Sequence, residues 1–345
     1  MSRIYFYDTT LRDGSQGEGV VFSVDDKIRI AKKLDALGID YIEGGWPGSN
    51  PRDLEFFRKA NNMNFRHAKL AAFGSTKRAG NCADQDLVLQ NLLAANTPVV
   101  AIFGKSWGFQ VENVLRISPE ENLNIIEDSV RFLKSNGKEV VYDAEHFFDG
   151  YKANPSYALD SLKAALRGGA DALVLCDTNG GTLPLDFMEI FQAVQKSISA
   201  PIGVHIHNDS GMAAAISIIA AQQGAIQIQG TFNGYGERCG NANLTTIIPS
   251  LLLKLGFDSP VKTNLNLLTK TSRLISELSN LQHDERQPYV GSSAFAHKAG
   301  MHVDAIKKNP VTFEHMKNDM DINAGRIITG EKSIEEVGEE TFKML

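Results

Sequence analysis

The sequence predicts an α/β fold, a closed (β/α)₈ TIM barrel, followed by a small, mostly helical C-terminal subdomain. Two observations support this prediction. Eight short β-rich apolar runs alternate with eight longer segments of helical period, and together they occupy about 256 of the 345 residues, which is the size of a parallel eightfold barrel. A doubly wound open sheet is the competing fold, but eight repeats at near-constant spacing favour closure.

Each predicted strand is a short apolar run that ends in polar or glycine-rich sequence. The eight runs are Ile4–Tyr7, Tyr41–Glu43, Lys69–Phe73, Val99–Phe103, Val140–Asp143, Ala172–Cys176, Ile202–Ile206 and Ile226–Phe232.

The predicted helices lie after these runs and carry start and stop signals. They are Val24–Leu37, Pro51–Asn62, Ala83–Ala95, Pro119–Ser135, Pro155–Gly168, Pro184–Ser197, Met212–Gly224 and Leu244–Leu255. Four of them begin with proline, which is tolerated in a first turn. Glycines follow several helix ends, where a left-handed residue is wanted.

The alternation of strand and helix patterns stops after Gly256-Phe257, which predicts that the chain has three parts. Residues 1–256 form the barrel, and residues 257–288 form a linker with a helix at Leu267–Leu281. Residues 289–345 form a helical subdomain that carries His297 and His302. The charged stretch Glu331–Leu345 has no Gly or Asn stop signal after it, which leaves open whether the chain is trimmed or naturally short.

Composition excludes several classes of protein. Lys and Arg total 35 against 41 Asp and Glu, a net charge of −6, and no basic stripe suggests nucleic-acid binding. No apolar run approaches the roughly 20 residues that span a membrane. The N-terminus enters a strand pattern at once, so we expect no signal peptide. Three widely spaced cysteines, Cys82, Cys176 and Cys239, suit a reducing cytosol, so we expect a cytoplasmic protein.

A His-x-His pair is the most informative polar feature. Residues two apart in a strand point to the same side, so His205 and His207 would share the barrel mouth, where TIM-barrel chemistry lies. With a carboxylate they could hold Mg²⁺, Mn²⁺ or Zn²⁺. Asp13 is the preferred third ligand and Asn241 a weaker fourth, but Asp8 stays an alternative to Asp13. Two core histidines bound to backbone carbonyls are the alternative to a metal site.

Two neighbouring features have a weaker signal. Arg12 would place a positive charge beside the metal, where a guanidinium can hold a carboxylate or polarise a carbonyl; a surface arginine is the alternative. The loop Gly234–Gly240 is glycine-rich, but its third glycine comes one residue late for a dinucleotide site. Cys239 has no histidine near it in sequence, so we do not expect a nucleophile.

Four ordered motifs resemble the 2-isopropylmalate, homocitrate and citramalate synthase family, in the DRE-TIM metallolyase superfamily. They are LRDGSQ at Leu11–Gln16 with Lys27 after it, HIHNDSG at His205–Gly211, GYGERCGNA at Gly234–Ala242 and AGMH at Ala299–His302. The match runs essentially from end to end. IEGGWPGSNPRDLEFF and DAEHFFDG look most like the citramalate synthase branch, whose oxo acid is pyruvate.

This resemblance implies an acyltransferase of isoleucine biosynthesis. It would catalyse a metal-dependent Claisen condensation of acetyl-CoA with a 2-oxo acid, giving citramalate and CoA when that acid is pyruvate. The implied metal residues are Asp13, His205 and His207 with Asn241 nearby.

The resemblance also implies roles for other residues. Arg12 would contact the ketone oxygen, Thr178 the substrate carboxylate, and Glu145 would take part in acetyl-CoA activation. His302 would be an acid/base residue that the C-terminal subdomain supplies to the partner's site in a homodimer. Family members usually carry a further domain that senses the end-product amino acid, so we expect this polypeptide to lack feedback inhibition.

The acidic residues at the predicted mouth are evidence for a bound cation that does not depend on the resemblance. Five acids follow the strands, and they would suit an anionic substrate poorly without an ion and Arg12: Asp8, Glu43, Glu145, Asp177 and Asp209.

Other activities stay open. 2-Isopropylmalate and homocitrate synthases are the near alternatives. An acyl-CoA lyase or aldolase would share the arginine–aspartate and His-x-His pieces but lack the GERxGNA loop and the histidine-bearing subdomain. A biotin-dependent carboxyltransferase needs a lysine at an inner strand end, and none of the eight predicted strands shows one. A metal-binding regulator would require a lost catalytic group, yet each expected group is present.

Overall fold

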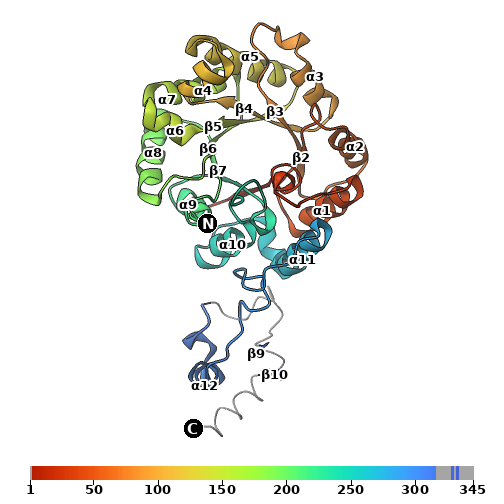
Figure 1. Ribbon diagram of the computed structural model, residues 1–345, viewed down its shortest axis with the longest axis vertical. Coiled ribbons are helices and arrows are strands. Elements are labelled where there is room, and N and C mark those ends of the chain that lie inside the picture. The colour runs from red at the N-terminus through yellow and green to blue at the C-terminus, as the bar shows by residue number, and fades with distance from the viewer. Residues whose placement is uncertain (1, 316–327, 330–331, 334–345) are drawn as a thin grey trace.

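The computed structural model describes residues 2–315, 328–329 and 332–333, and it forms the predicted closed barrel (Figure 1). Within these residues eight parallel strands pair in chain order, and β1 pairs with β8 to close the ring. The strands are β1 (Tyr5–Asp8), β2 (Tyr41–Gly45), β3 (Lys69–Ser75), β4 (Val99–Lys105), β5 (Glu139–Glu145), β6 (Ala172–Asp177), β7 (Ile202–Ile206) and β8 (Gln227–Gly230).

Four strands, β2 to β5, extend two residues further toward the mouth than their apolar runs predict. In β4 the side chains of Val99, Ala101 and Phe103 belong to the interior cluster, and Lys105 keeps the same parity at the strand end. The prediction that the strands lack an inner lysine is therefore wrong. It failed because the apolar pattern ends at Phe103, although the backbone pairing with β5 continues to Lys105.

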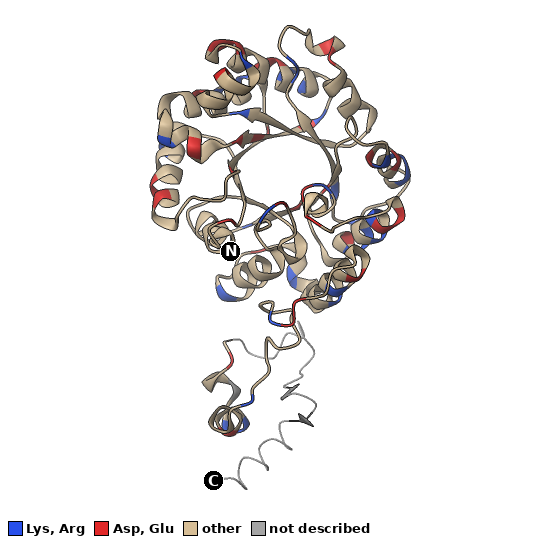
Figure 2. Cartoon of the chain, in the orientation of Figure 1, with Lys and Arg blue, Asp and Glu red and all other residues tan. Residues whose placement is uncertain are grey.

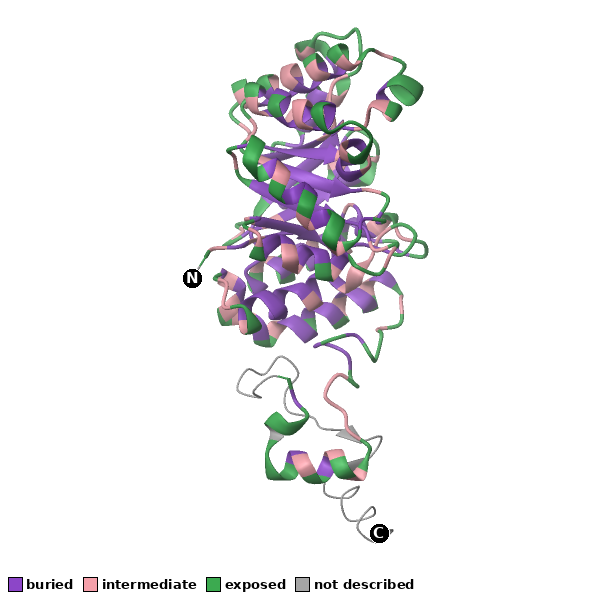
Figure 3. Ribbon diagram, turned by 90° about the vertical axis from the view of Figure 1, so that its left-hand side faces the viewer, coloured by how far each residue is buried: buried purple, intermediate pink, exposed green. Residues whose placement is uncertain are grey.

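The outer helices bury one face against the sheet and expose the other (Figure 3). They are α1 (Val24–Leu37), α2 (Pro51–Ala60), α3 (Leu87–Ala94), α5 (Pro119–Ser135), α7 (Pro155–Gly168), α8 (Pro184–Ser197), α9 (Ala213–Gln222) and α10 (Leu244–Pro249). Acidic and basic residues are intermixed on α1 and α2 (Figure 2). No helix within the described residues has the length and apolar content to cross a membrane.

Capping residues explain where several helices begin, and why some observed helices differ from the predicted ones. Ser23 forms a capping box with Asp26 at the start of α1, and Gly38 ends the helix in the left-handed region. The segment predicted as one helix from Ala83 divides, because Asp86 accepts the backbone N–H groups of Val88 and Leu89 and starts α3 anew. The segment predicted at Leu244–Leu255 likewise divides, into α10 and a π-helix at Ser250–Lys254.

Loops at the mouth contain helical turns that the sequence did not predict. They are α4 (Gly108–Gln110) with a π-helix at Val111–Leu115, and α6 (Phe147–Ala153). A 3₁₀-helix at Pro260–Leu267, in the part of the predicted linker that precedes its helix, was not predicted either. α11 (Leu268–Ser279) then packs against α1 and completes the outer ring (Figure 1).

Beyond α11 the chain leaves the barrel. α12 (Gly300–Lys308) lies outside the ring in both views (Figures 1 and 3). The two-residue strands Ile328–Thr329 and Lys332–Ser333 pair antiparallel. The domain boundaries at 256 and 288 stay a prediction, and most of the charged stretch Glu331–Leu345 lies outside the described residues.

A buried ion pair anchors the end of β2. Lys27 of α1 donates to the Gly44 carbonyl over 3.0 Å and pairs with Asp53 of α2, whose other oxygen accepts the Trp46 backbone N–H over 2.9 Å. Gly45 has a φ of +149°, and a Cβ there would collide with the Asp53 carboxylate. Burial lowers the pKa of the Lys27 ammonium, and Asp53 opposes that shift.

We expect Lys27→Met to lower the free energy of unfolding by about 3–5 kcal/mol, because it leaves the Asp53 carboxylate buried without its cation. Urea unfolding followed by circular dichroism measures the loss. Lys27→Met combined with Asp53→Asn should recover a large part of it, since the amide oxygen still accepts the Trp46 N–H and carries no charge. Equal instability of the single and double variants would contradict this role.

Candidate active site

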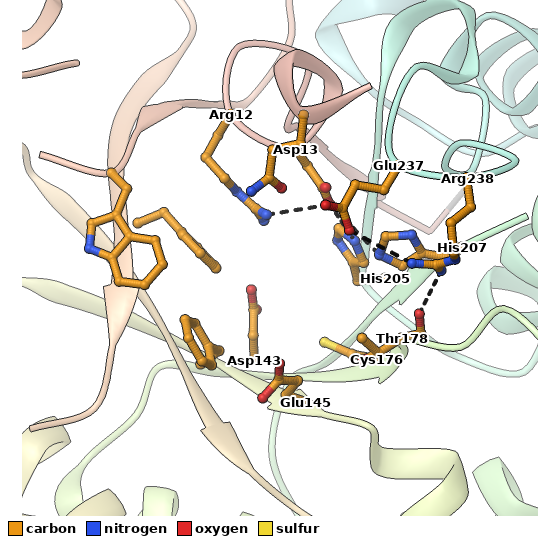
Figure 4. Close-up of a pocket in the computed structure, with 14 residues that line it drawn as sticks. Arg12, Asp13, Asp143, Glu145, Cys176, Thr178, His205, His207, Glu237 and Arg238 are labelled. Atoms are coloured by element: carbon orange, nitrogen blue, oxygen red, sulfur yellow. Dashed lines mark hydrogen bonds and ion pairs between the residues drawn. The ribbon is translucent and has the colours of Figure 1, made fainter. Parts of the chain in front are cut away.

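An open cavity of about 230 Å³ lies at the carboxyl ends of the strands (Figure 4). Its lining comes from the strand ends and the loops that follow them: Arg12, Asp13, Gln16, Trp46, Phe73, Phe103, Asp143, Glu145, Cys176, Thr178, His205, His207, Glu237 and Arg238. Six of the eight residues that we proposed for the site are therefore brought together in one cavity. Asn241 adjoins it, and His302 lies elsewhere.

Asp13, His205 and His207 form a buried group that could hold a metal ion. The Asp13 Oδ2 atom lies 3.0 Å from Nε2 of His205 and 3.8 Å from Nε2 of His207. One ligand atom from each residue falls within 4.8 Å of the others. The two histidines share a side as strand periodicity predicts, although His207 stands just beyond β7 and forms a bridge with Asn241.

The carboxylate of Asp8, the alternative ligand, is occupied by hydrogen bonds within the loop after β1. It accepts the Thr10 backbone N–H over 3.0 Å and the Thr10 hydroxyl over 2.9 Å, and that hydroxyl oxygen accepts the Phe232 N–H. Burial raises the pKa of Asp8 to about 7. The geometry therefore favours Asp13 over Asp8 as the candidate ligand.

Asn241 meets a simple test for a fourth ligand. Its Nδ2 donates to the Tyr235 carbonyl over 3.1 Å, while its Oδ1 is buried without a hydrogen-bond partner among the described residues. A Cβ on Gly236 would collide with Asn241, and one on Gly240 would collide with the Gly234 carbonyl. The glycines thus let the loop fold onto itself. Two imidazoles, a carboxylate and a free amide oxygen fit a divalent cation.

The titration behaviour of the three candidate ligands follows from burial and their mutual charges. Burial alone would raise the pKa of Asp13, but the Arg12 guanidinium and the His205 imidazole hold it well below its usual value. Burial opposes the charge on His205, yet Asp13 raises the pKa of that imidazole. Burial and the charge of His205 lower the pKa of His207 to about 4, so His207 is neutral near pH 7, as a metal ligand must be.

Arg12 is held rigidly. Its Nε donates to Glu43 over 2.6 Å, its Nη1 lies 3.4 Å from Asp13 Oδ2, and its guanidinium lies 3.7 Å above the Phe73 ring. The Tyr7 hydroxyl donates to the second Glu43 oxygen over 2.7 Å. Because only 11% of the side chain is exposed, the alternative of a surface arginine is wrong.

The other two cavity residues that the resemblance implied are also held by neighbours. Glu145, at the end of β5, forms an ion pair with Lys105 at the end of β4. The Thr178 hydroxyl oxygen accepts the His146 backbone N–H over 2.9 Å, and its carbonyl accepts an N–H of Arg238 over 2.9 Å.

The predicted acidic mouth needs correction, since only one of its five acids lines the cavity. Asp8 and Asp177 accept N–H groups of their own loops, and Asp209 pairs with Arg238. Glu43 lies beneath Arg12. Asp8 and Asp177 fail because each directly follows an inward-facing strand residue, Tyr7 or Cys176, and adjacent strand residues face opposite sides of the sheet. Glu43 and Asp209 fail because each is paired with an arginine.

Sequence reasoning missed several lining residues. Asp143 precedes Glu145 by two in β5, and this spacing could have identified it. Burial raises the pKa of Asp143 to about 7, with a further contribution from Glu43. Trp46 and Phe103 gave no signal, because apolar residues at strand ends resemble core.

His302 does not line the described cavity. It lies on α12, its ring stacks on Phe313 at 4.0 Å, and its ring centroid is 6.3 Å from that of His297.

The fold and the site define a (β/α)₈-barrel protein with a candidate two-histidine, one-carboxylate metal centre at its mouth. Residues 3–275 match the HMGL-like family, and the chain belongs to this family. Residues 289–340 match the homocitrate synthase post-HMGL domain-like family.

Individual proteins agree with this family membership. The chain is 54% identical over 333 residues to the (R)-citramalate synthase of Geobacter sulfurreducens, covering 96% of the chain and 63% of that protein. It is 34% identical over 332 residues to a 2-isopropylmalate synthase of Sulfolobus acidocaldarius, covering 96% and 83%. The HMG-CoA lyase of Bacillus subtilis shares the fold, with a TM-score of 0.70 and 21% identity over 82% of this chain and 96% of that one. The chain thus spans less than two thirds of the length of the first of these relatives.

We expect Asp13→Ala and His207→Ala each to lose bound divalent ion while the barrel stays folded, because side chains at the mouth add little to the core. Losing the hydrogen-bonding partner of a metal ligand lowers activity by about 10–100-fold. Losing the ligand itself should lower activity by more than that. Elemental analysis beside circular dichroism measures both. Asp8→Asn, whose amide oxygen can still accept the Thr10 backbone N–H, is the matched control and should retain the ion. Full ion content in both ligand variants would refute the assignment.

Proposed function

We propose that the protein is a citramalate synthase, an acyltransferase that condenses acetyl-CoA with pyruvate to give citramalate and CoA. One observation carries this proposal: in a chain 54% identical to an (R)-citramalate synthase, six residues implied for that chemistry line one cavity. A place in isoleucine biosynthesis belongs to the same proposal.

A divalent cation held by Asp13, His205 and His207, with Asn241 as a fourth ligand, would supply Lewis-acid chemistry and a template for the oxo acid. Mn²⁺, Mg²⁺ and Zn²⁺ all suit this donor set. Arg12 would donate to the ketone oxygen, where negative charge develops as the new carbon–carbon bond forms. Its contacts with Glu43 and Phe73 fix its direction before substrate arrives.

Thr178 is suited to bind the substrate carboxylate. Its oxygen already accepts the His146 backbone N–H, so its own O–H is left to donate. A hydroxyl donor directed at a carboxylate forms a charge-assisted hydrogen bond.

Glu145 would take a proton from the acetyl methyl group, and Lys105 would orient its carboxylate. The resulting enolate carbon would attack the ketone carbon, and the ketone oxygen would become an alkoxide. A proton from His302 of the proposed dimer's other subunit, or from water, would turn that alkoxide into the tertiary alcohol of the product. Water then hydrolyses the thioester, which releases CoA and makes the condensation irreversible.

The cavity wall supports a small oxo acid. Trp46 packs edge-on against Phe73 and Phe103, with ring centroids 5.8 and 5.7 Å apart, and these two rings stack at 5.5 Å. Three mutually packed aromatic rings have little freedom to make room for a branched side chain. Pyruvate, which carries only a methyl group, is therefore favoured over 2-oxoisovalerate.

Lys105 removes our argument against a carboxyltransferase, since β4 does end in an inner lysine. The match of residues 289–340 to a domain that follows HMGL barrels in homocitrate synthases favours synthesis instead.

The homodimer and the cytoplasmic location also stay proposals. In the proposed dimer His302 would reach a partner's cavity, and the irregular, turn-rich connection of residues 281–299 between α11 and α12 supports this proposal by carrying α12 away from its own barrel (Figure 1).

We expect the highest kcat/KM for pyruvate among pyruvate, 2-oxobutyrate, 2-oxoisovalerate and 2-oxoglutarate, measured as CoA release. One methylene in such a pocket is worth about 1–3 kcal/mol, so weak use of 2-oxobutyrate is expected. Phe103→Ala should raise the 2-oxobutyrate to pyruvate ratio by about 10-fold. Phe109→Ala, an exposed aromatic that does not line the cavity, should leave it unchanged. A wild-type preference for 2-oxoisovalerate would instead indicate a 2-isopropylmalate synthase.

We expect inactive His302→Ala and inactive His205→Ala proteins to regain activity when their subunits exchange. A mixed dimer would hold one doubly defective site and one intact site, so equal mixing should restore about a quarter of wild-type activity. Native mass spectrometry verifies the exchange. If mixed dimers form and stay inactive, His302 does not act in a partner's site.

A further inference from the structure

Gln229 is a buried polar residue beneath the candidate metal centre that no motif singled out. It lies on β8 with none of its surface exposed. Its amide stands between two cavity residues: Oε1 is 2.9 Å from Nδ1 of His205, and Nε2 is 3.2 Å from Oδ1 of Asp143. Nε2 also lies 3.5 Å from Oε1 of Gln227.

The neighbours fix which way this amide points. A glutamine amide has a donor end and an acceptor end. Nε2 faces Oε1 of Gln227 and the Asp143 carboxyl group, so with Asp143 ionised the opposite orientation would set oxygen against oxygen at both contacts. The Gln229 carbonyl must therefore face His205, where it can only accept a hydrogen bond. Hence Nδ1 of His205 carries the proton.

This proton leaves the other ring nitrogen as the ligand atom. Nε2 of His205 is the nitrogen that lies 3.0 Å from Asp13 Oδ2. When Nδ1 holds the only ring proton, both atoms present lone pairs, and either a proton on Nε2 or a bound cation must lie between them.

We propose that Gln229 is a positioning residue that holds His205 in the Nδ1–H tautomer and orients its Nε2 toward the cation. Asp143 completes the arrangement by fixing the far end of the amide. The proposal rests on the proposed metal site. Partners of this kind orient histidine ligands and raise their basicity in known metal sites.

The tautomer can be tested without metal or substrate. In the metal-free wild-type protein labelled with ¹⁵N-histidine, the neutral His205 ring should show its proton on Nδ1, coupled through the hydrogen bond to Gln229. Gln229→Met should remove that preference. A neutral His205 with its proton on Nε2 in the wild type would overturn the proposal, even if no variant folds.

Ion affinity tests the consequence. Titration calorimetry with Mn²⁺ should show about 10–100-fold weaker binding for Gln229→Met than for the wild type. Gln227→Met is the matched control, because Gln227 is buried on the same strand and face but forms no hydrogen bond to a histidine among those described. It should bind Mn²⁺ nearly as the wild type does, because the shorter contact with Asp143 still fixes the Gln229 amide. Equal loss in both variants, or loss in neither, would contradict a specific role for Gln229.

A rescue separates positioning from packing. Gln229→Glu with Asp143→Asn reverses the polarity of the contact: the asparagine amide donates to the glutamate, and the other glutamate oxygen still accepts from Nδ1. This double variant should bind Mn²⁺ more tightly than Gln229→Met, and weaker or equal binding would count against the proposal. If the wild type binds no Mn²⁺, the proposed metal site fails, while the NMR result still decides the tautomer.

Discussion

The site depends on balancing buried charge. The carboxylates of Asp13, Glu43 and Asp143 are each at most 3% exposed at the barrel mouth, and uncompensated charges there would cost several kcal/mol each. Arg12 contacts the first two of them directly. A divalent ion between Asp13 and the histidines would supply the remaining positive charge. The same arrangement places Arg12 and the ion where an anionic oxo acid must bind.

Much of this site follows from two rules that can be applied to the sequence. Strand ends of a barrel converge, and side chains two residues apart share a face, which together predicted the grouping of His205, His207 and Asp13. The same rules fail where a strand's bounds are uncertain. Lys105 extends β4 beyond its apolar run, so its pairing with Glu145 was not predicted. Position also could not separate Asp13 from Asp8, because that choice depends on hydrogen bonds to Thr10.

Contacts between distant segments were beyond sequence reasoning. Gln229 supports His205 across the β7–β8 pair, and Phe73 supports Arg12 from β3. Neither residue belongs to a recognisable motif in its own segment, so its contact with a site residue could not be inferred from the sequence. The loop after β8 shows the same limit. Its glycines were recognised, but their purpose, close packing around Asn241, appears only in three dimensions. The barrel rules say least about the C-terminal segment, because α12 lies outside the barrel (Figures 1 and 3).

A crystal structure of the protein grown with Mn²⁺ and pyruvate would test the central claim most directly. Anomalous scattering at the manganese edge locates the ion without reference to any assumed ligand. The account predicts one peak bound by a carboxylate oxygen of Asp13 and by Nε2 of both His205 and His207, with the oxo acid between it and Arg12. A manganese peak elsewhere in the cavity, or pyruvate bound away from these residues with the three side chains left without an ion, would contradict it.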